Sequence, residues 1–253
     1  VVVVAVVLPV TAIVLTALTR AWGLLPTLDN LTLENFRYVL FDLRLSQRAI
    51  RNSLFLAVTA ATATMLIGTV ISYVVIKTRI RGRKLLDLLG TMPYSVPGTV
   101  FALGMIIAWN RAFWGRLNIY NTILIILVAY IARYSAFSLR TVGASLHQVA
   151  PALEESARVS GASWFQSLKD IVLPLIKPGI AAGWLLVFMP TLRELTISIL
   201  LWSAGNETIG VVVYNLNSAG QVTASAALAT LMIAVILILN GLVKRLTGGK
   251  YGY

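Results

Sequence analysis

Long apolar stretches, each close to the length needed to cross a lipid bilayer, dominate this sequence. Six of them can be marked, at about 1–18, 52–76, 85–109, 121–139, 179–202 and 224–243. Hydrophobic residues make up 58% of the chain and charged residues only 12%, whereas soluble domains carry roughly a quarter charged residues. A bilayer core about 30 Å thick needs about 20 apolar residues per helix, and lipid-exposed backbone must satisfy its own hydrogen bonds. The sequence therefore predicts an all-α membrane protein with six transmembrane helices.

The first apolar stretch does not have the features of a signal peptide. It lacks an initiating Met, a basic segment before it and a small-residue cleavage site, and it contains Pro9. Because the chain starts within an apolar run, we expect it to be part of a longer protein, such as one half of a fused chain.

Basic residues predict which side of the membrane each loop faces, because short cytoplasmic loops are enriched in Lys and Arg. The clearest marker follows the second apolar stretch and contains Lys77, Arg79, Arg81, Arg83 and Lys84. Alternation of the spans then places two further basic segments on the same, cytoplasmic side. These are the loop 140–178 and the C-terminal tail with Lys244, Arg245 and Lys250. Arginines in the segments 20–51 and 110–120 weaken this bias without reversing it.

Several functional classes are not supported by the composition. The net charge of +12 does not indicate nucleic-acid binding, because the cations are dispersed over loops and termini that flank apolar spans. The chain has no Cys and a single His, His147, so no metal site is predicted. It has no G-x-x-x-x-G-K-[ST] phosphate-binding loop and no constellation of catalytic residues. We therefore expect neither catalysis nor a bound cofactor in this chain.

The polar loop 140–178 carries helix signals rather than linker composition. Pro151 suits the first turn of a helix, and Glu154 and Glu155 lie where the positive end of the helix dipole favours anions. Gly161 can adopt the left-handed conformation that ends such a helix. We therefore expect a short helix from about Pro151 to Ser160.

A second helix is predicted directly after this one. Ser163 and Gln166 have the spacing of a capping box, and Pro174 is expected to end the helix. Its apolar residues recur at helical spacing and are Trp164, Phe165, Leu168, Ile171 and Val172. Two interpretations fit two helices joined at Gly161: an amphipathic hairpin on the lipid headgroups, or a surface read by another protein.

The spacing in this loop resembles the EAA motif of ABC importer permeases. That motif reads Glu-Ala-Ala, three residues, Gly, nine residues, Ile, one residue and Leu-Pro. The matching residues are Glu155, Ala157, Gly161, Ile171, Leu173 and Pro174, and Ser156 replaces the first Ala. The likeness covers most of the chain, because the family's permease unit also has about six spans with this loop in the same place. It implies a type I importer fold and a single permease domain over residues 1–253.

The resemblance also implies partners and residue roles. The first loop helix would be a coupling helix that docks on a cytoplasmic ABC ATPase dimer, which binds the ATP and Mg. The residues implied in coupling are Glu154, Glu155, Ser156, Ala157, Arg158, Gly161, Ile171, Leu173 and Pro174. A second permease half or subunit and an extracytoplasmic substrate-binding protein would complete the transporter. Its location would be the bacterial inner membrane.

The closer resemblance is to the second half of fused permeases of the ferric iron type, on the segment 194–205. Ferric iron is therefore the expected substrate. Thiamine, polyamine, phosphonate and sulfate-type permeases share much of the pattern, so those substrates remain alternatives. An ion-coupled secondary transporter would be expected to show internal repeats, and none is visible.

Three ionisable residues fall inside the predicted spans: Arg133, Arg193 and Glu194. Because burying a charge in the membrane is costly, such residues usually face a cavity or a partner. Pro190 leaves a backbone carbonyl without its helical donor, which marks 189–196 as the expected lining of a translocation pathway. Two interpretations remain for Arg133 and Glu194, a role in the pathway or a structural ion pair between helices.

Overall fold

The computed structural model describes residues 3–110 and 118–246, with the side chains of 242–246 left aside. Lys250 of the predicted cytoplasmic tail and the first two residues of the first predicted span lie outside these ranges. Regular structure in the described ranges is helical, apart from one isolated antiparallel bridge between Thr19 and Leu31. The predicted all-α fold is confirmed. The chain divides into two compact units, residues 1–53 with 202–253 and residues 54–201. That these form one permease domain stays a prediction.

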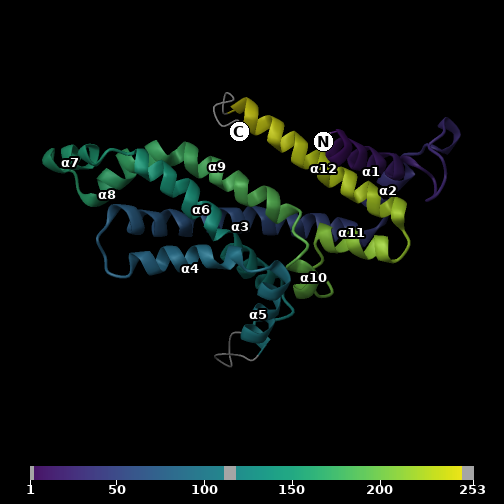
Figure 1. Cartoon of the computed structure of the whole chain (residues 1–253), viewed down its shortest axis with the longest axis horizontal. Coiled ribbons are helices and arrows are strands. Elements are labelled where there is room, and N and C mark those ends of the chain that lie inside the picture. The colour runs from purple at the N-terminus through teal and green to yellow at the C-terminus, as the bar shows by residue number, and fades with distance from the viewer. Residues whose placement is uncertain (1–2, 111–117, 247–253) are drawn as a thin grey trace. The chain divides into compact units, whose positions relative to one another are not determined.

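The first unit is built around the C-terminal helix α12 (Val222–Leu246), which lies alongside the N-terminal helices in Figure 1. The other elements are η1 (Val3–Val7), α1 (Leu8–Leu18), η2 (Leu28–Asn30), α2 (Glu34–Arg37), η3 (Tyr38–Asp42), the start of α3 (Arg44–Lys77) and α11 (Ile209–Ser218). Helices α1, α2 and α11 all pack on α12.

The second unit is arranged around α6 (Ile123–Gln148), which packs against α4 and α9. Its other elements are the rest of α3, α4 (Arg83–Ser95), α5 (Gly98–Asn110), α7 (Pro151–Val159), α8 (Trp164–Ser167), η4 (Leu168–Val172), α9 (Leu173–Leu192) and α10 (Ser198–Leu201). Helices α7 and α8 lie at one end of this unit (Figure 1).

Small residues allow α6 to approach its neighbours closely. A Cβ atom added at Gly179 of α9 would lie 2.9 Å from the Cβ of Ser145, and one added at Gly68 of α3 would lie 2.6 Å from the Cβ of Ser138. Neither distance is tolerable between real atoms, so glycine is required at both positions. Close packing through small residues is typical of membrane helices, where apolar surface alone gives no preference for a protein neighbour over lipid.

Four helical segments are long and apolar enough to cross a membrane. They are Arg44–Lys77, Ile123–Gln148, Trp164–Leu192 and Val222–Gly241, and they correspond to the second, fourth, fifth and sixth predicted spans. The first predicted span is a shorter apolar helix, Val3–Leu18. With the bent pair α4 and α5 counted as one span, the described residues contain up to five, so the predicted count of six is not confirmed.

The third predicted span is not one straight helix. Helices α4 and α5 meet at an angle of 114°, and Val96 between them is extended, with φ −82° and ψ 136°. Pro97 explains the break, because a proline disfavours helical geometry in the residue before it and has no N–H to donate.

The fifth predicted span differs at both ends. It begins at Trp164 rather than near Gly179, and Pro174 does not end a helix as we expected. Pro174 is the second residue of α9 and directly follows the π-helical turn η4, and a proline is tolerated in the first turn of a helix. The helix ends at Leu192, so Arg193 and Glu194 follow it rather than lying within it.

Candidate functional site

The predicted coupling helix is α7, and Gly161 ends it with φ +87°. The N–H of Gly161 donates to the carbonyl of Arg158 at 3.0 Å, and that of Ala162 donates to the carbonyl of Ala157 at 2.9 Å. These two bonds define the Schellman motif, in which a left-handed residue satisfies the last carbonyls of a helix. The helix and its glycine end are therefore confirmed, with the end within one residue of the expected one.

The capping box that starts the second helix is also present. The backbone N–H of Gln166 donates to Ser163 Oγ at 3.3 Å, and the backbone N–H of Ser163 donates to Gln166 Oε1 at 2.7 Å. Because these bonds satisfy N–H groups that have no partner within the helix, the start of α8 is fixed at Trp164.

The two glutamates of α7 differ in their surroundings. Glu155 is exposed, whereas Glu154 is only 8% exposed. Glu154 Oε1 lies 2.8 Å from Lys77 Nζ, and the hydroxyl of Tyr73 donates to Glu154 Oε2 at 3.4 Å. The indole of Trp164 in turn donates to the Tyr73 hydroxyl at 2.9 Å. Glu154 therefore anchors α7 to the end of α3.

The sequence did not predict this anchor. Lys77 was identified there only as a marker of topology, and Tyr73 was not identified at all. Lys77 also donates to the carbonyl of Val149 at 2.9 Å. It therefore contacts both the residue at the end of α6 and the first turn of α7. The loop after α3 and the loop 140–178 consequently lie on the same side, as alternation of spans predicts.

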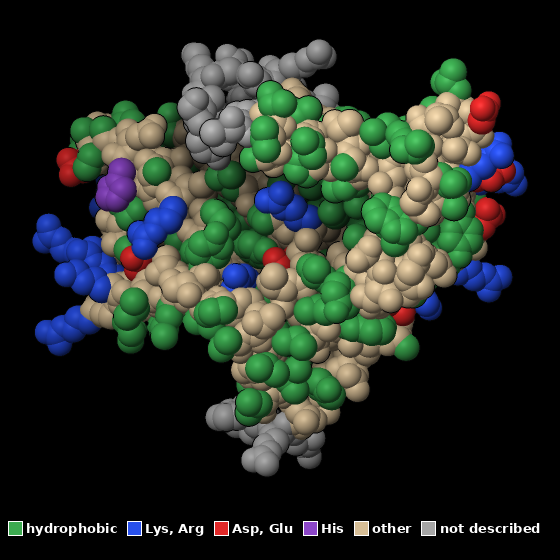
Figure 2. All heavy atoms as spheres, turned by 45° about the vertical axis from the view of Figure 1, so that its right-hand side comes forward, with side chains coloured by type: hydrophobic (Ala, Val, Ile, Leu, Met, Phe, Trp, Pro, Cys, Tyr) green, Lys and Arg blue, Asp and Glu red, His purple; other side chains and the backbone are tan. Residues whose placement is uncertain are grey.

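Basic side chains cluster on the surface at the end of the unit that contains α7. In Figure 2, blue basic side chains gather around the single His of the chain, His147, which precedes α7. Arg140 lies 3.6 Å from Asp87 of α4 at this end, although both side chains are partly exposed. Which side of the membrane this end faces stays a prediction.

The remaining residues of the EAA pattern mostly lie on the surface. Ser156, Arg158, Leu173 and Pro174 are exposed, and Ala157 and Ile171 are half-buried. Apolar side chains accompany them: Val159 is 91% exposed and Phe165 63% exposed. A short helix with one buried anchor and an otherwise exposed, partly apolar surface is suited to docking on another protein.

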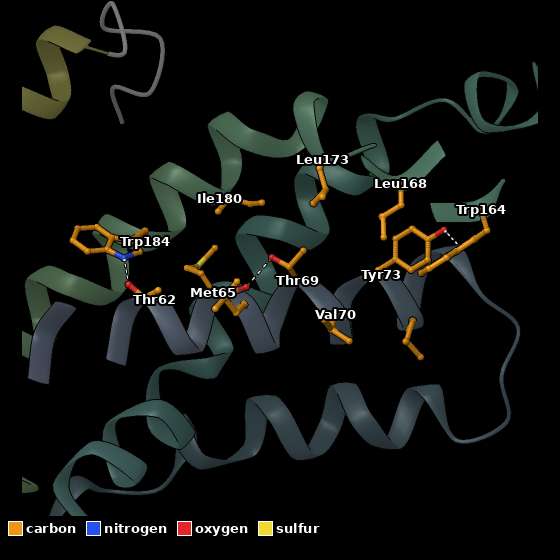
Figure 3. A pocket seen from close by; sticks show the side chains of 12 residues that line it. Thr62, Met65, Thr69, Val70, Tyr73, Trp164, Leu168, Leu173, Ile180 and Trp184 are labelled. Atoms are coloured by element: carbon orange, nitrogen blue, oxygen red, sulfur yellow. Dashed lines mark hydrogen bonds between the residues drawn. The ribbon is translucent and has the colours of Figure 1, made fainter. Parts of the chain in front are cut away.

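A groove runs along α3 below this loop (Figure 3). It encloses about 450 Å³ and its lining is mainly apolar. The lining residues are Thr62, Met65, Leu66, Thr69, Val70, Tyr73, Val74, Trp164, Leu168, Leu173, Ile180 and Trp184. Hydrogen bonds close both ends, from Trp184 Nε1 to Thr62 Oγ1 at 3.0 Å and from Trp164 to Tyr73. Within a bilayer, lipid chains or another helix would cover such a surface.

Glu194 lies in the segment between α9 and α10, half-buried. The hydroxyl of Tyr134 donates to its Oε2 at 2.5 Å. Its Oε1 accepts from Thr196 Oγ1 at 2.5 Å and from the backbone N–H of Ile197 at 3.0 Å. The carboxylate therefore satisfies a backbone group at the start of α10 and is held by α6.

Arg133 does not pair with Glu194, and the ion-pair interpretation is wrong for this structure. Among the described residues the ion pairs are Arg48 with Glu207, Lys77 with Glu154, and Arg140 with Asp87. Arg133 Nη1 instead donates to the carbonyl of Val96 at 2.6 Å, and the guanidinium lies 5.7 Å from the ring centre of Tyr94. The carbonyl at the α4–α5 break is thus the partner of this half-buried cation.

Pro190 and Arg193 complete the predicted pathway segment. Pro190 lies inside α9 near its end, and Arg193 caps that end and is exposed. Arg133 lies on α6 and contacts the α4–α5 break, whereas Glu194 lies in the break between α9 and α10, where Tyr134 of α6 holds it. Sequence reasoning missed Tyr134 and Thr196, since an uncharged residue in an apolar window gives no signal of its own.

The comparisons with known proteins agree with this geometry. Residues 76–248 match a family model described as the binding-protein-dependent transport system inner membrane component. The chain is 25% identical over 240 residues to the 2-aminoethylphosphonate transport system permease protein PhnV of Salmonella paratyphi A, covering 94% of this chain and 88% of that protein. It is 33% identical over 187 residues to the ferric transport system permease protein FbpB 1 of Haemophilus influenzae, covering 72% of this chain and 28% of that protein.

The fold is shared with a solved chain of a bacterial ABC transporter involved in the import of the acidic polysaccharide alginate. The TM-score is 0.74 at 20% identity, with 97% of this chain and 92% of that chain covered. This likeness shows the fold, whereas the family match over residues 76–248, more than half of the chain, shows the class: the protein is a membrane component of a transport system. It belongs to the family of binding-protein-dependent transport system inner membrane components, the ABC permeases.

Proposed function

We propose that the chain is a transmembrane subunit, or half-subunit, of an ATP-driven importer of the bacterial inner membrane, and that α7 couples it to a cytoplasmic ATPase. The observation that carries this proposal is the contrast within α7. One residue, Glu154, is buried and paired, whereas Glu155, Arg158 and Val159 are exposed at the end of the unit where basic side chains gather.

The exposed surface of α7 and α8 has the composition of an interface. Val159 and Phe165 supply apolar area, and Glu155 and Arg158 supply charged groups around it. Apolar anchors within a polar rim are the usual arrangement of a protein–protein contact. Half-buried Ala157 adds no bulk, so a partner can approach the helix closely.

The energy source lies outside this chain in the proposed assembly. The sequence has no phosphate-binding loop, so ATP and Mg would be bound by an ATPase dimer. A second permease half or subunit would complete the pathway, and an extracytoplasmic binding protein would deliver the substrate. The residues Arg133, Pro190, Arg193 and Glu194 are proposed to border the path.

Cysteine cross-linking tests the coupling role directly, because the chain contains no Cys and a single introduced thiol is unique in it. We expect Val159→Cys to cross-link to the ATPase subunit in the assembled complex. Leu28→Cys is the matched control, since Leu28 is 90% exposed and Val159 is 91% exposed. In intact cells an impermeant maleimide should label Leu28→Cys and not Val159→Cys.

Two results would contradict the proposal. One is cross-linking of both positions or of neither, and the other is labelling of Val159→Cys from outside. Transport that continues without the ATPase and follows an ion gradient would instead favour a secondary carrier.

For the substrate we propose ferric iron, with a phosphonate as the second candidate. The ferric permease of Haemophilus influenzae supports iron at 33% identity, but the match covers only 28% of that protein. The phosphonate permease of Salmonella paratyphi A supports the second candidate, because the match extends over 88% of its length. Uptake of labelled Fe³⁺ and of 2-aminoethylphosphonate into vesicles that contain the complete complex and its binding protein separates the two. Uptake of neither would exclude both.

A further inference from the structure

Two helix breaks in the second unit face the same helix. The first lies at residues 96–97 between α4 and α5, and the second lies at residues 193–197 between α9 and α10. Broken helices at membrane depth are tolerated only where the freed backbone groups meet protein or water. Both breaks therefore need partners supplied by neighbouring side chains.

Adjacent residues of α6 supply those partners. Arg133 donates to the carbonyl of Val96 at 2.6 Å, and Tyr134 donates to Glu194 Oε2 at 2.5 Å. Consecutive residues on a helix point about 100° apart, so a single turn of α6 can reach both breaks. The two contacts are thus mechanically joined through α6.

The breaks also touch each other. Gly98, the first residue of α5, is buried against Thr196, and a Cβ added there would lie 2.9 Å from the Cβ of Thr196. Thr196 donates in turn to Glu194 Oε1. The contact between α5 and the segment before α10 therefore depends on a glycine at this position and on the orientation of the Glu194 carboxylate.

A long helix connects the second break to the loop 140–178. The helical segment Trp164–Leu192 contains 29 residues without interruption, which at 1.5 Å per residue is about 43 Å. It starts at the capping box beside α7 and ends two residues before Glu194. Displacement of the loop can therefore be transmitted to Glu194 along this continuous helical segment.

We propose that three contacts together form a latch that closes the translocation pathway. They are the hydrogen bond from Tyr134 to Glu194, the hydrogen bond from Arg133 to the carbonyl of Val96, and the packing of Gly98 on Thr196. Tyr134 is a positioning residue, because it holds the carboxylate of Glu194 in place. While the latch is closed, both carboxylate oxygens of Glu194 are occupied by the protein's own donors. Movement of α9 breaks the Tyr134 bond and turns the carboxylate toward the path. This inference depends on the proposed transport function.

The test uses a thiol reporter beside the latch but outside it. Leu195→Cys is labelled with an impermeant maleimide in the nucleotide-free complete complex. Adding Tyr134→Phe should raise the labelling rate about tenfold or more, the factor expected on losing a hydrogen bond to a charged group. Tyr130→Phe is the control, because Tyr130 lies one turn earlier on α6, is buried, and makes no hydrogen bond to Glu194 in the described structure.

The outcomes separate the latch from the proposed function. The Val159→Cys cross-link to the ATPase is measured with each Tyr variant in a parallel preparation. An intact cross-link with unchanged labelling would overturn the latch alone, and equal increases in both Tyr variants would also overturn it, as general loosening. If Tyr134→Phe fails to assemble, Gly98→Ala is used in its place. It should raise the labelling rate of Leu195→Cys, because the added Cβ forces Thr196 away. An unchanged labelling rate would overturn the proposal.

Discussion

Replacing Gly161 by Ala tests whether the angle between α7 and α8 matters for transport. Gly161 has φ +87°, and an added Cβ meets no atom within 4 Å. The substitution therefore acts through the backbone and not through a clash. Gly82, in the turn before α4, has φ +89° and equally open surroundings. Gly82→Ala is consequently a matched control with the same local strain at a different place.

The expected cost can be estimated for both positions. A left-handed conformation costs a residue with a Cβ about 1–2 kcal/mol. Ala also reduces the freedom of the unfolded chain, which offsets about 0.4–1 kcal/mol of this. Each variant should therefore disfavour the native turn by about 1 kcal/mol, a factor of about five in population.

The assay compares transport per ATP hydrolysed with thermal stability in the complete complex. Both variants should lower Tm by similar amounts. Only Gly161→Ala should reduce transport per ATP, because only its turn sets the angle at which α7 meets α8. Equal coupling losses in the two variants, or unchanged coupling in Gly161→Ala with a lowered Tm, would refute the reasoning.

Three further predictions concern the same unit. Lys77→Met should destabilise the protein by about 3–5 kcal/mol, because it leaves the buried carboxylate of Glu154 unpaired, and Lys77→Met with Glu154→Leu should recover most of the loss. A double variant no more stable than the single one, measured by thermal unfolding, would contradict this. Ser163→Ala should cost about 1 kcal/mol and speed amide exchange in the first turn of α8, and unchanged exchange would argue against the cap. Gly183→Ala should cost about 1–3 kcal/mol by overpacking, whereas Gly104→Ala meets no atom within 4 Å and should not lower Tm.

The loop was predictable because its signals are local. The Schellman glycine Gly161 and the capping pair Ser163 and Gln166 act over three to five residues, so a single sequence contains all the information they need. The apolar windows were found for a similar reason, since hydropathy averaged over a span does not depend on the tertiary fold. Four of the six windows correspond to helices long enough to cross.

The remaining features depend on contacts that the sequence does not display. Averaged hydropathy hides the bend at Val96, although Pro97 was a local signal for it. Arg133 pairs with a backbone carbonyl, a partner that every residue offers and that no motif marks. We expected Glu194 to lie within a helix, because a charged residue in an apolar window does not mark where a helix ends.

The buried pair of Glu154 and Lys77 limits how α7 can move. If α7 were attached only through Gly161, a docked ATPase could swing it without moving the membrane helices. The ion pair at 2.8 Å fixes it also to the end of α3, and the Trp164 to Tyr73 hydrogen bond fixes α8 to the same helix. Displacing α7 must therefore either break a buried ion pair, which is costly, or move α3 and α9 together. Rigid-body movement of the loop with both helices is the less costly route.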